Sequence, residues 1–165
     1  MQRTQFLIII LLIANLVATI WFGLSEKTQP ELSLIEKASK HELPPIISQK
    51  VREQLLQQFT TLFNASDYDG LYNMFGPAAK AQLNKDDVIN VMGKLKEVFR
   101  SIQEGAYVNS EHVGIKGSMN MYRLNYSVKF SEAADFGSKG TLQIIVGVQG
   151  QEYQVFYMKL NIDNV

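Results

Sequence analysis

Residues 119–130, MNMYRLNYSVKF, decide the fold class, because apolar and polar side chains alternate along them without a break from residue 122 onward. The apolar members of the alternation are Tyr122, Leu124, Tyr126, Val128 and Phe130. A period of two places successive side chains on opposite faces of a β-strand. The stretch therefore predicts a strand in a sheet that buries one face.

Three further runs around it have the composition of strands, namely residues 105–116, 140–148 and 152–162. Gly117 and Gly150 mark two of the turns between them, and a loop is expected over residues 133–137. In the last run we expect one face to carry Phe156, Met158, Leu160 and Ile162, and the other to carry Tyr153, Val155, Tyr157 and Lys159. Together the four runs predict an antiparallel meander.

Before Gln103 the apolar period is that of a helix. Residues 48–65 and 85–102 each carry an apolar stripe, with Ser48 and Asn84 as the expected N-caps. Residues 69–75 and 77–83 predict two shorter helical pieces, separated at Gly76. Helices grouped ahead of antiparallel strands predict an α+β fold in which a cone of helices packs on one face of a four-stranded meander sheet.

The N-terminal part predicts a membrane anchor. Residues 6–24 contain no charged residue, and 19 residues of helix span about 28 Å, close to the thickness of a bilayer core. Arg3 precedes this run, so positive-inside orientation places the N-terminus in the cytoplasm and the rest outside it, on the far side of the inner membrane. The alternative is a cleaved signal peptide, which would leave a secreted or periplasmic protein.

The sequence thus divides into a tail and anchor over 1–24, a linker with a short helix over 25–47, and an α+β domain over 48–165. The chain has no cysteine, which excludes disulfides, thiolate nucleophiles and cysteine-based zinc sites. Of its 16 basic and 16 acidic residues, only Arg3 precedes Ser25, so the remainder is close to neutral. Such a balance argues against nucleic acid as a partner.

A motif after the first long helix carries a family resemblance. Residues 67–69 are Asp-Tyr-Asp and residues 71–75 are Leu-Tyr-Asn-Met-Phe, followed by a capped helix and a long meander. This pattern resembles the nuclear transport factor two-like, or cystatin-like, superfamily, and most of all its bacterial membrane-anchored extracytoplasmic domains of unknown function. The resemblance covers about residues 48–163, and Ser66 stands where those domains usually have glycine. It implies the fold and leaves the function open, because that superfamily includes isomerases, dehydratases, transport factors, secretion scaffolds and binding modules.

Asp67, Asp69 and Tyr72 form the densest cluster of reactive side chains. As a catalytic set they would be an acid–base site, with a carboxylate desolvated beside a tyrosine. As a helix start, Asp67 caps, Asp69 complements the helix dipole, and Tyr72 packs inward with Phe75. The second interpretation explains both carboxylates without burying a charge, and we prefer it.

The two histidines give no metal site and no nucleophilic triad. His112 lies in the first strand, where alternation puts the neighbouring Glu111 on the opposite face, and His41 lies in the linker. Neither has a cysteine or a carboxylate at ligand spacing, and the Gly-containing segments lack a phosphate-binding loop. We therefore predict no catalytic residue, no metal and no cofactor.

Seven aromatic residues are predicted to surround the space between helices and sheet. They are Phe59, Phe63, Tyr72, Phe75, Tyr122, Tyr126 and Phe156. They either fill a core or line a pocket for a small apolar ligand, to which the tyrosine hydroxyls would add polar groups.

The expected function is binding of a protein or small ligand by a membrane-anchored extracytoplasmic domain without catalysis. Two alternatives remain open, a scaffold subunit of an envelope secretion complex and a small isomerase or hydratase with Asp67 or His112 as base.

Overall fold

A computed structural model of the chain describes residues 42–131 and 138–162. The helices are α2 (Gln49–Asn64), α3 (Tyr68–Met74), α4 (Pro77–Lys80) and α5 (Lys85–Phe99). The strands are β1 (Ile102–Lys116), β2 (Met119–Phe130), β3 (Lys139–Gln149) and β4 (Glu152–Ile162). The α+β class and the order of elements are confirmed, while the loop expected over 133–137 lies wholly outside the described residues.

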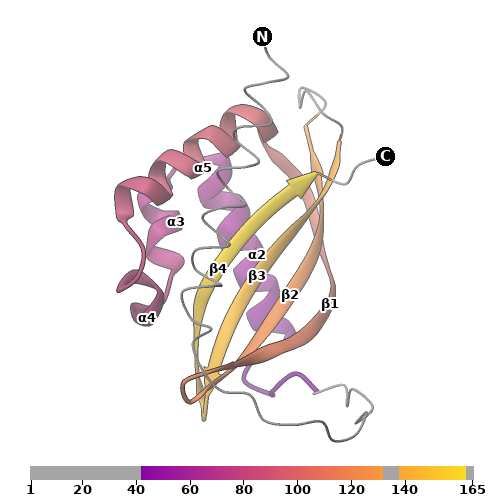
Figure 1. The fold of residues 1–165 in the computed structure, drawn as a ribbon. Helices are drawn as coiled ribbons and strands as arrows, with labels where there is room; N and C mark the ends of the chain where they lie inside the picture. The colour runs from indigo at the N-terminus through magenta and orange to yellow at the C-terminus, as the bar shows by residue number, and fades with distance from the viewer. Residues whose placement is uncertain (1–41, 132–137, 163–165) are drawn as a thin grey trace, which may run out of the picture. The chain divides into compact units, whose positions relative to one another are not determined.

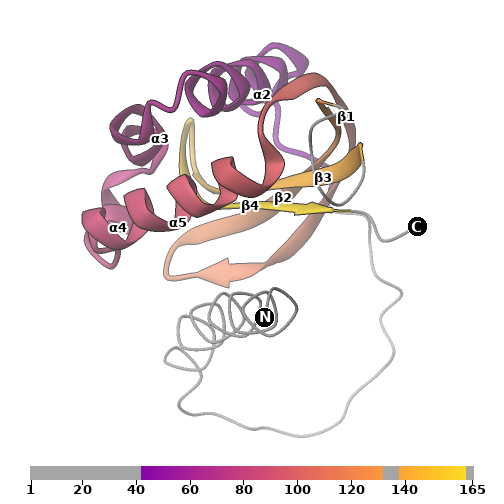
Figure 2. The ribbon, with the colours of Figure 1, turned by 90° about the horizontal axis from the view of Figure 1, so that it is seen from above.

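The four strands form one antiparallel sheet in chain order, β1-β2-β3-β4, as the meander predicts. Figure 1 shows the strands curving together around α2, and Figure 2 shows α2, α3, α4 and α5 on one side of the sheet. The alternation in β2 holds, because Tyr122, Leu124, Tyr126, Val128 and Phe130 are all buried toward the helices.

The helix starts follow from their capping side chains. Ser48 Oγ accepts from the Val51 N–H at the start of α2, Asp67 Oδ1 from the Gly70 N–H before α3, and Asn84 Oδ1 from two N–H groups of α5. Each side chain satisfies backbone donors that have no partner inside the helix. These three caps were all predicted.

The end of α2 is a Schellman motif built on a serine. The Asp67 N–H donates to Leu62 O at 2.9 Å and the Ser66 N–H to Phe63 O at 3.1 Å, which is the hydrogen-bond pattern of that motif. Ser66 has φ +58°, the left-handed conformation that the motif requires. The sequence difference noted at Ser66 therefore falls at a position where glycine fits without strain.

Helix α5 ends earlier than the sequence predicts. The apolar stripe was extended to Ile102, but the helix ends at Phe99, Arg100 adopts φ +60°, and Ile102 is the first residue of β1. An apolar residue three positions after Phe99 fits the stripe of a helix and also fits the buried first position of a strand. Ile102, which starts β1, is buried in the core.

Strand β4 contains a bulge that overturns the predicted division of its faces. Ile145 pairs with Tyr157 and Val146 with Val155, so Phe156 is the extra residue. Val155 is therefore buried in the core with Met158, contrary to the prediction that they lie on opposite faces. Phe156 instead lies against Gly147, on the face away from the helices. The Lys116 ammonium lies over its ring, 5.1 Å from the ring centre.

Part of that outer face is polar and cross-linked between strands. Asn109, Asn125 and Gln143 form a row of amide hydrogen bonds across β1, β2 and β3, at 2.8 and 3.1 Å. Arg123 pairs with Glu111 at 2.6 Å in the neighbouring row. The sheet is thus apolar on its helix side and hydrogen-bonded on the other.

Residues 39–165 form one compact unit of the chain. Within this unit, Ile47 is only 2% exposed and packs in the core, although the sequence assigns it to the linker. No helix among residues 42–131 and 138–162 is long and apolar enough to cross a membrane. The predicted anchor over 6–24 lies outside the described residues and stays a prediction.

Candidate functional site

The seven aromatic residues predicted to surround the helix–sheet space do not share one environment. Five are buried in the core, and Tyr72 and Phe156 are partly buried around it. The buried five are Phe59, Phe63, Phe75, Tyr122 and Tyr126. Phe59 and Phe63 stack at 5.7 Å between ring centroids. The buried five therefore pack as core side chains.

Tyr126 is the most deeply buried tyrosine, and its hydroxyl has a structural partner. It donates to the Arg52 carbonyl of α2 at 3.1 Å. Its ring meets the Tyr107 ring edge-on at 5.8 Å, and the Arg52 guanidinium lies 4.2 Å from the centre of that second ring. Burial raises the pKa of Tyr126 well above its ordinary value. The group is a stable hydrogen-bond donor that ties α2 to β2.

Tyr72 lies at the surface of α3 and does not pack fully inward as expected. The ammonium groups of Lys80 and Lys85 lie 5.2 and 5.9 Å from its ring centre. Lys85 also pairs with Asp69 at 2.5 Å, and this hydrogen bond and charge raise the pKa of Lys85. Its neighbour Phe75 is buried, with 6.4 Å between the two ring centroids.

The two aspartates of the candidate acid–base cluster are accounted for by local structure. Asp67 is exposed and caps α3, as predicted, and Asp69 is in the first turn and bound to Lys85. Both carboxylates therefore have partners in the local structure. Neither carboxylate lies in the buried core.

His112 lies on the helix side of the sheet, 5.2 Å from the Tyr122 ring centroid. Glu111, its neighbour, is on the outer face with Arg123, which confirms that the two do not form an adjacent pair. Among the described residues, no group of three or more His, Asp or Glu side chains could hold a metal ion.

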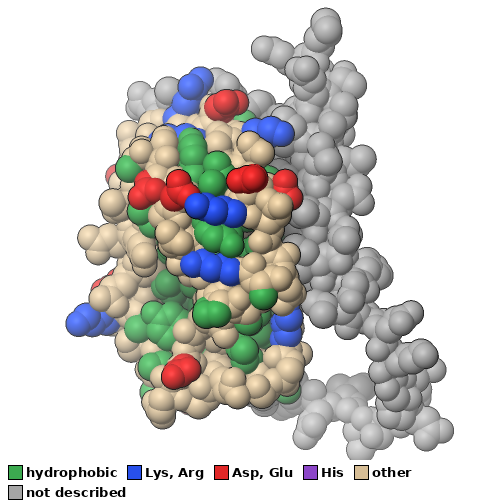
Figure 3. Space-filling view, turned by 90° about the vertical axis from the view of Figure 1, so that its left-hand side faces the viewer, with side chains coloured by type: hydrophobic (Ala, Val, Ile, Leu, Met, Phe, Trp, Pro, Cys, Tyr) green, Lys and Arg blue, Asp and Glu red, His purple; other side chains and the backbone are tan. Residues whose placement is uncertain are grey.

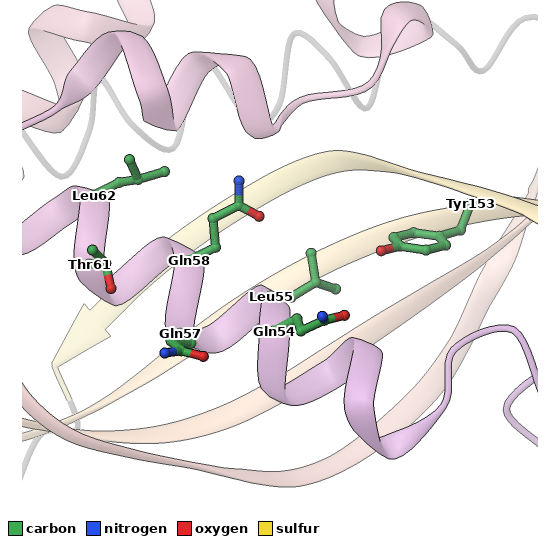
Figure 4. Close-up of a pocket in the computed structure, with 7 residues that line it drawn as sticks. All are labelled: Gln54, Leu55, Gln57, Gln58, Thr61, Leu62 and Tyr153. Atoms are coloured by element: carbon green, nitrogen blue, oxygen red, sulfur yellow. The ribbon is translucent and has the colours of Figure 1, made fainter.

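An open hollow in the described residues runs along the exposed side of α2, with a volume of about 510 Å³ (Figure 4). It is lined by Gln54, Leu55, Gln57, Gln58, Thr61, Leu62 and Tyr153. In Figure 4 the Tyr153 ring extends from β4 toward Leu55 at one end of the helix. None of the seven predicted aromatic residues lines this hollow.

A second hollow, of about 260 Å³, lies on the other flank of α2, where the helix faces β1. Its lining is Glu53, Leu56, Gln57, Thr60, Thr61 and Gly105. A Cβ at Gly105 would come within 3.0 Å of Leu56, so the helix and the strand touch at the floor of this hollow. Gln57 and Thr61 belong to both hollows and form the ridge between them.

The side chains on this ridge are polar but uncharged. From Gln54 to Ser66 the sequence has no charged residue, although Gln54, Gln57, Gln58 and Thr61 are exposed. This uncharged stretch is visible in the sequence, but the prediction of the helix rested on its apolar stripe and gave the stretch no role. By contrast, acidic and basic side chains intermingle on the face that carries α3, α4 and α5 (Figure 3).

No protein-family model matches this chain, and no curated protein matches it either. The resemblance to the nuclear transport factor two-like superfamily stays a prediction from the motif at residues 66–75.

Proposed function

We propose that the chain is a membrane-anchored extracytoplasmic domain that binds a partner through the exposed side of α2 and catalyses no reaction. The observation that carries this proposal is the uncharged polar ridge between the two hollows. Glutamine and threonine side chains can donate and accept hydrogen bonds, and their desolvation on contact costs much less than that of charged groups. An exposed helix side of this kind suits contact with another molecule.

The chemistry of the remaining candidates supports a binding role. A general base needs a protonatable group that is free to take a proton from a bound substrate. Asp67 is committed to its cap and Asp69 to Lys85. The tyrosine hydroxyl of Tyr126 is committed to α2. These three groups are therefore engaged in the structure of the domain, which supports recognition over acid–base chemistry at these positions.

The absence of cysteine allows a single thiol to test both parts of the proposal. Gln58→Cys places it on the exposed side of α2, and Thr4→Cys places it ahead of the predicted span. In intact cells a membrane-impermeant maleimide should label the thiol at position 58. The thiol at position 4 should react only after permeabilisation. Labelling of both positions, or only of position 4, contradicts the proposed topology.

The same Gln58→Cys protein, carrying a maleimide–benzophenone photocrosslinker, then tests binding. Lys94→Cys on the exposed side of α5 is the matched control, since its side chain lies on another helix of the same domain. We expect illumination in native membranes to give a discrete adduct from position 58 that position 94 does not give. Equal adduct patterns at the two positions would contradict a binding role for α2.

A further inference from the structure

The two edges of the sheet differ in how they are covered. At the β4 edge, Phe75 forms a parallel bridge with Val155, and the Gly76 N–H donates to Val155 O at 2.8 Å. Gln154 accepts from the Ala78 N–H at 3.1 Å beside it. At the start of β1 the Asn64 side chain hydrogen-bonds the backbone of Ile102, and no described residue outside the sheet forms a backbone–backbone hydrogen bond with the rest of this strand. Among the described residues, β1 is therefore the open edge (Figure 1).

This open edge also carries exposed apolar side chains. The described residues include three large apolar residues that are exposed, and two of them, Val108 at 57% and Ile115 at 71%, lie on β1. Natural edge strands usually carry charges or other devices that prevent pairing. Here bulges at Val108 and Val113 interrupt the strand, which leaves Asn109–His112 as a regular central run. The bulges thus limit the registers in which a further strand can pair with this edge, while the two apolar side chains stay exposed.

A second copy of the chain fits this edge. We infer that two copies pair their β1 strands antiparallel around a two-fold axis at Ser110. In this register Gly105 lies opposite Ile115 of the second copy, and Glu104 lies opposite Lys116. The same two contacts occur on both sides of the axis, as an isologous interface requires.

In the first contact, a protruding side chain of one copy meets a hollow of the other copy. Gly105 pairs with Val128, and Ile115 pairs with Asn120, which in turn pairs with Val148. Val128 and Val148 both lie in the core, and residues directly opposite each other in a sheet share a face. Gly105 and Ile115 are therefore both on the helix side. The exposed Ile115 side chain of each copy would enter the 260 Å³ hollow beside Gly105 of the other.

The second contact is a pair of opposite charges. Glu104 pairs with Lys129 and Lys116 with Met119, both on the outer face. Within its own copy the Lys116 ammonium donates to Gln82 Oε1 at 3.0 Å and lies 5.1 Å from the Phe156 ring centre, so it would exchange these contacts for Glu104 of the second copy. The Glu104 side chain is 73% exposed and its carboxylate lies 3.6 Å from Lys129, longer than a hydrogen bond. It can therefore accept a second lysine. An axis midway between residues 107 and 108 would instead oppose Glu104 to Glu111, and like charges disfavour that register.

Single-cysteine variants of the full chain in native membranes test the position of the axis. Residues directly opposite in antiparallel strands have Cα atoms about 4.5–5.5 Å apart, within the range for a disulfide. Ser110→Cys should therefore form a disulfide-linked dimer under mild oxidation. Ser127→Cys, an exposed serine one strand inward on β2, is the matched control and should form several-fold less. Equal yields from the two positions would overturn the inference.

A charge exchange tests the register without a thiol. Glu104→Lys and Lys116→Glu should each weaken the detergent-solubilised dimer by roughly tenfold, since each replaces two attractive pairs by repulsive ones. The double variant restores opposite charges and should recover the dimer. Ile115→Asp should abolish dimer formation while leaving the monomer folded, because the side chain is exposed. Failure of the double variant to recover, with both single variants folded, would contradict the proposed register.

Discussion

At the scale of the residue, Ser66 shows how one backbone conformation can end a helix. It occupies the left-handed position of the Schellman motif at φ +58°. Residues with a Cβ atom are strained in this region by about 1–2 kcal/mol, and asparagine and aspartate tolerate it best. The motif nevertheless forms, because it satisfies the carbonyls of Leu62 and Phe63 and leads directly to the Asp67 cap.

Ser66→Gly should raise the free energy of unfolding by about 0.5–1 kcal/mol, because relief of strain exceeds the extra entropy of the unfolded chain. Urea unfolding of the domain measures the change. Ser118→Gly is the control, since Ser118 is an exposed turn serine without a positive φ. A gain at position 66 no larger than at position 118 would contradict the strain at Ser66.

At this scale the helix caps could be predicted from the sequence, whereas the positive φ angles could not. Ser48, Asp67 and Asn84 were predicted as caps because a side-chain oxygen and the N–H groups it serves lie within three residues. The φ of Ser66 could not be predicted in the same way, since serine is uncommon in that conformation. Arg100 also has a positive φ, of +60°. Glycine is the residue that usually marks such a conformation after a helix, and neither position is glycine.

At the scale of the element, the junction of α2, α5 and β1 depends on Asn64. Its side-chain amide donates to Ile102 O at 2.8 Å and accepts from the Ile102 N–H at 2.9 Å. Lys96 of α5 donates to the Asn64 carbonyl at 3.1 Å, and burial lowers the pKa of this lysine. The last residue of one helix thus fixes the first residue of the sheet.

Asn64→Ala should lower the free energy of unfolding by about 2 kcal/mol, because it leaves the N–H and carbonyl of the buried Ile102 without these partners. Asn64→Asp keeps the acceptor and loses the donor, so we expect an intermediate loss. Denaturant unfolding of the three proteins gives the comparison. Asn109→Ala, which removes one exposed amide contact on β1, should stay within about 0.5 kcal/mol of the parent.

Element ends and bulges limited the sequence prediction at this scale. Ile102 was placed in α5 because its spacing from Phe99 is helical, yet an apolar first residue of a strand is equally buried. In β4 both Val155 and Phe156 are apolar, so either phase of the alternation agrees with a buried face. The bulge that selects Val155 depends on pairing with β3, which a single strand does not reveal.

At the scale of the whole domain, the helix–sheet space is filled from both sides. Side chains from all four strands pack against α2, α3, α4 and α5, and no buried polar or charged residue is found among those the structure describes. Ile47 adds a residue from ahead of α2 to this core. The core could be predicted from periodicity, whereas the hollows depend on how far α2 stands from β1 and β4.

A fragment of residues 42–165 should unfold in one cooperative transition, and Ile47→Ala in that fragment should cost about 3 kcal/mol by creating a cavity. Chemical denaturation followed by circular dichroism measures both. Ile46→Ala, the adjacent and only partly buried residue, is the matched control and should cost less than half as much. A loss at position 47 as small as at position 46 would show that Ile47 is not part of the core.

The strand order has a consequence for how the chain folds. Each strand pairs with the one made just before it, so the meander can grow from short-range contacts as synthesis proceeds. The bridge between Phe75 and Val155 is different, because its two residues are separated by most of the domain. A nascent chain that stops before residue 152 would leave the β3 edge open and the α4 side of the sheet unsealed. Such a chain would expose apolar surface and an unpaired strand edge, which chaperones bind, and pairing of β4 would cover both.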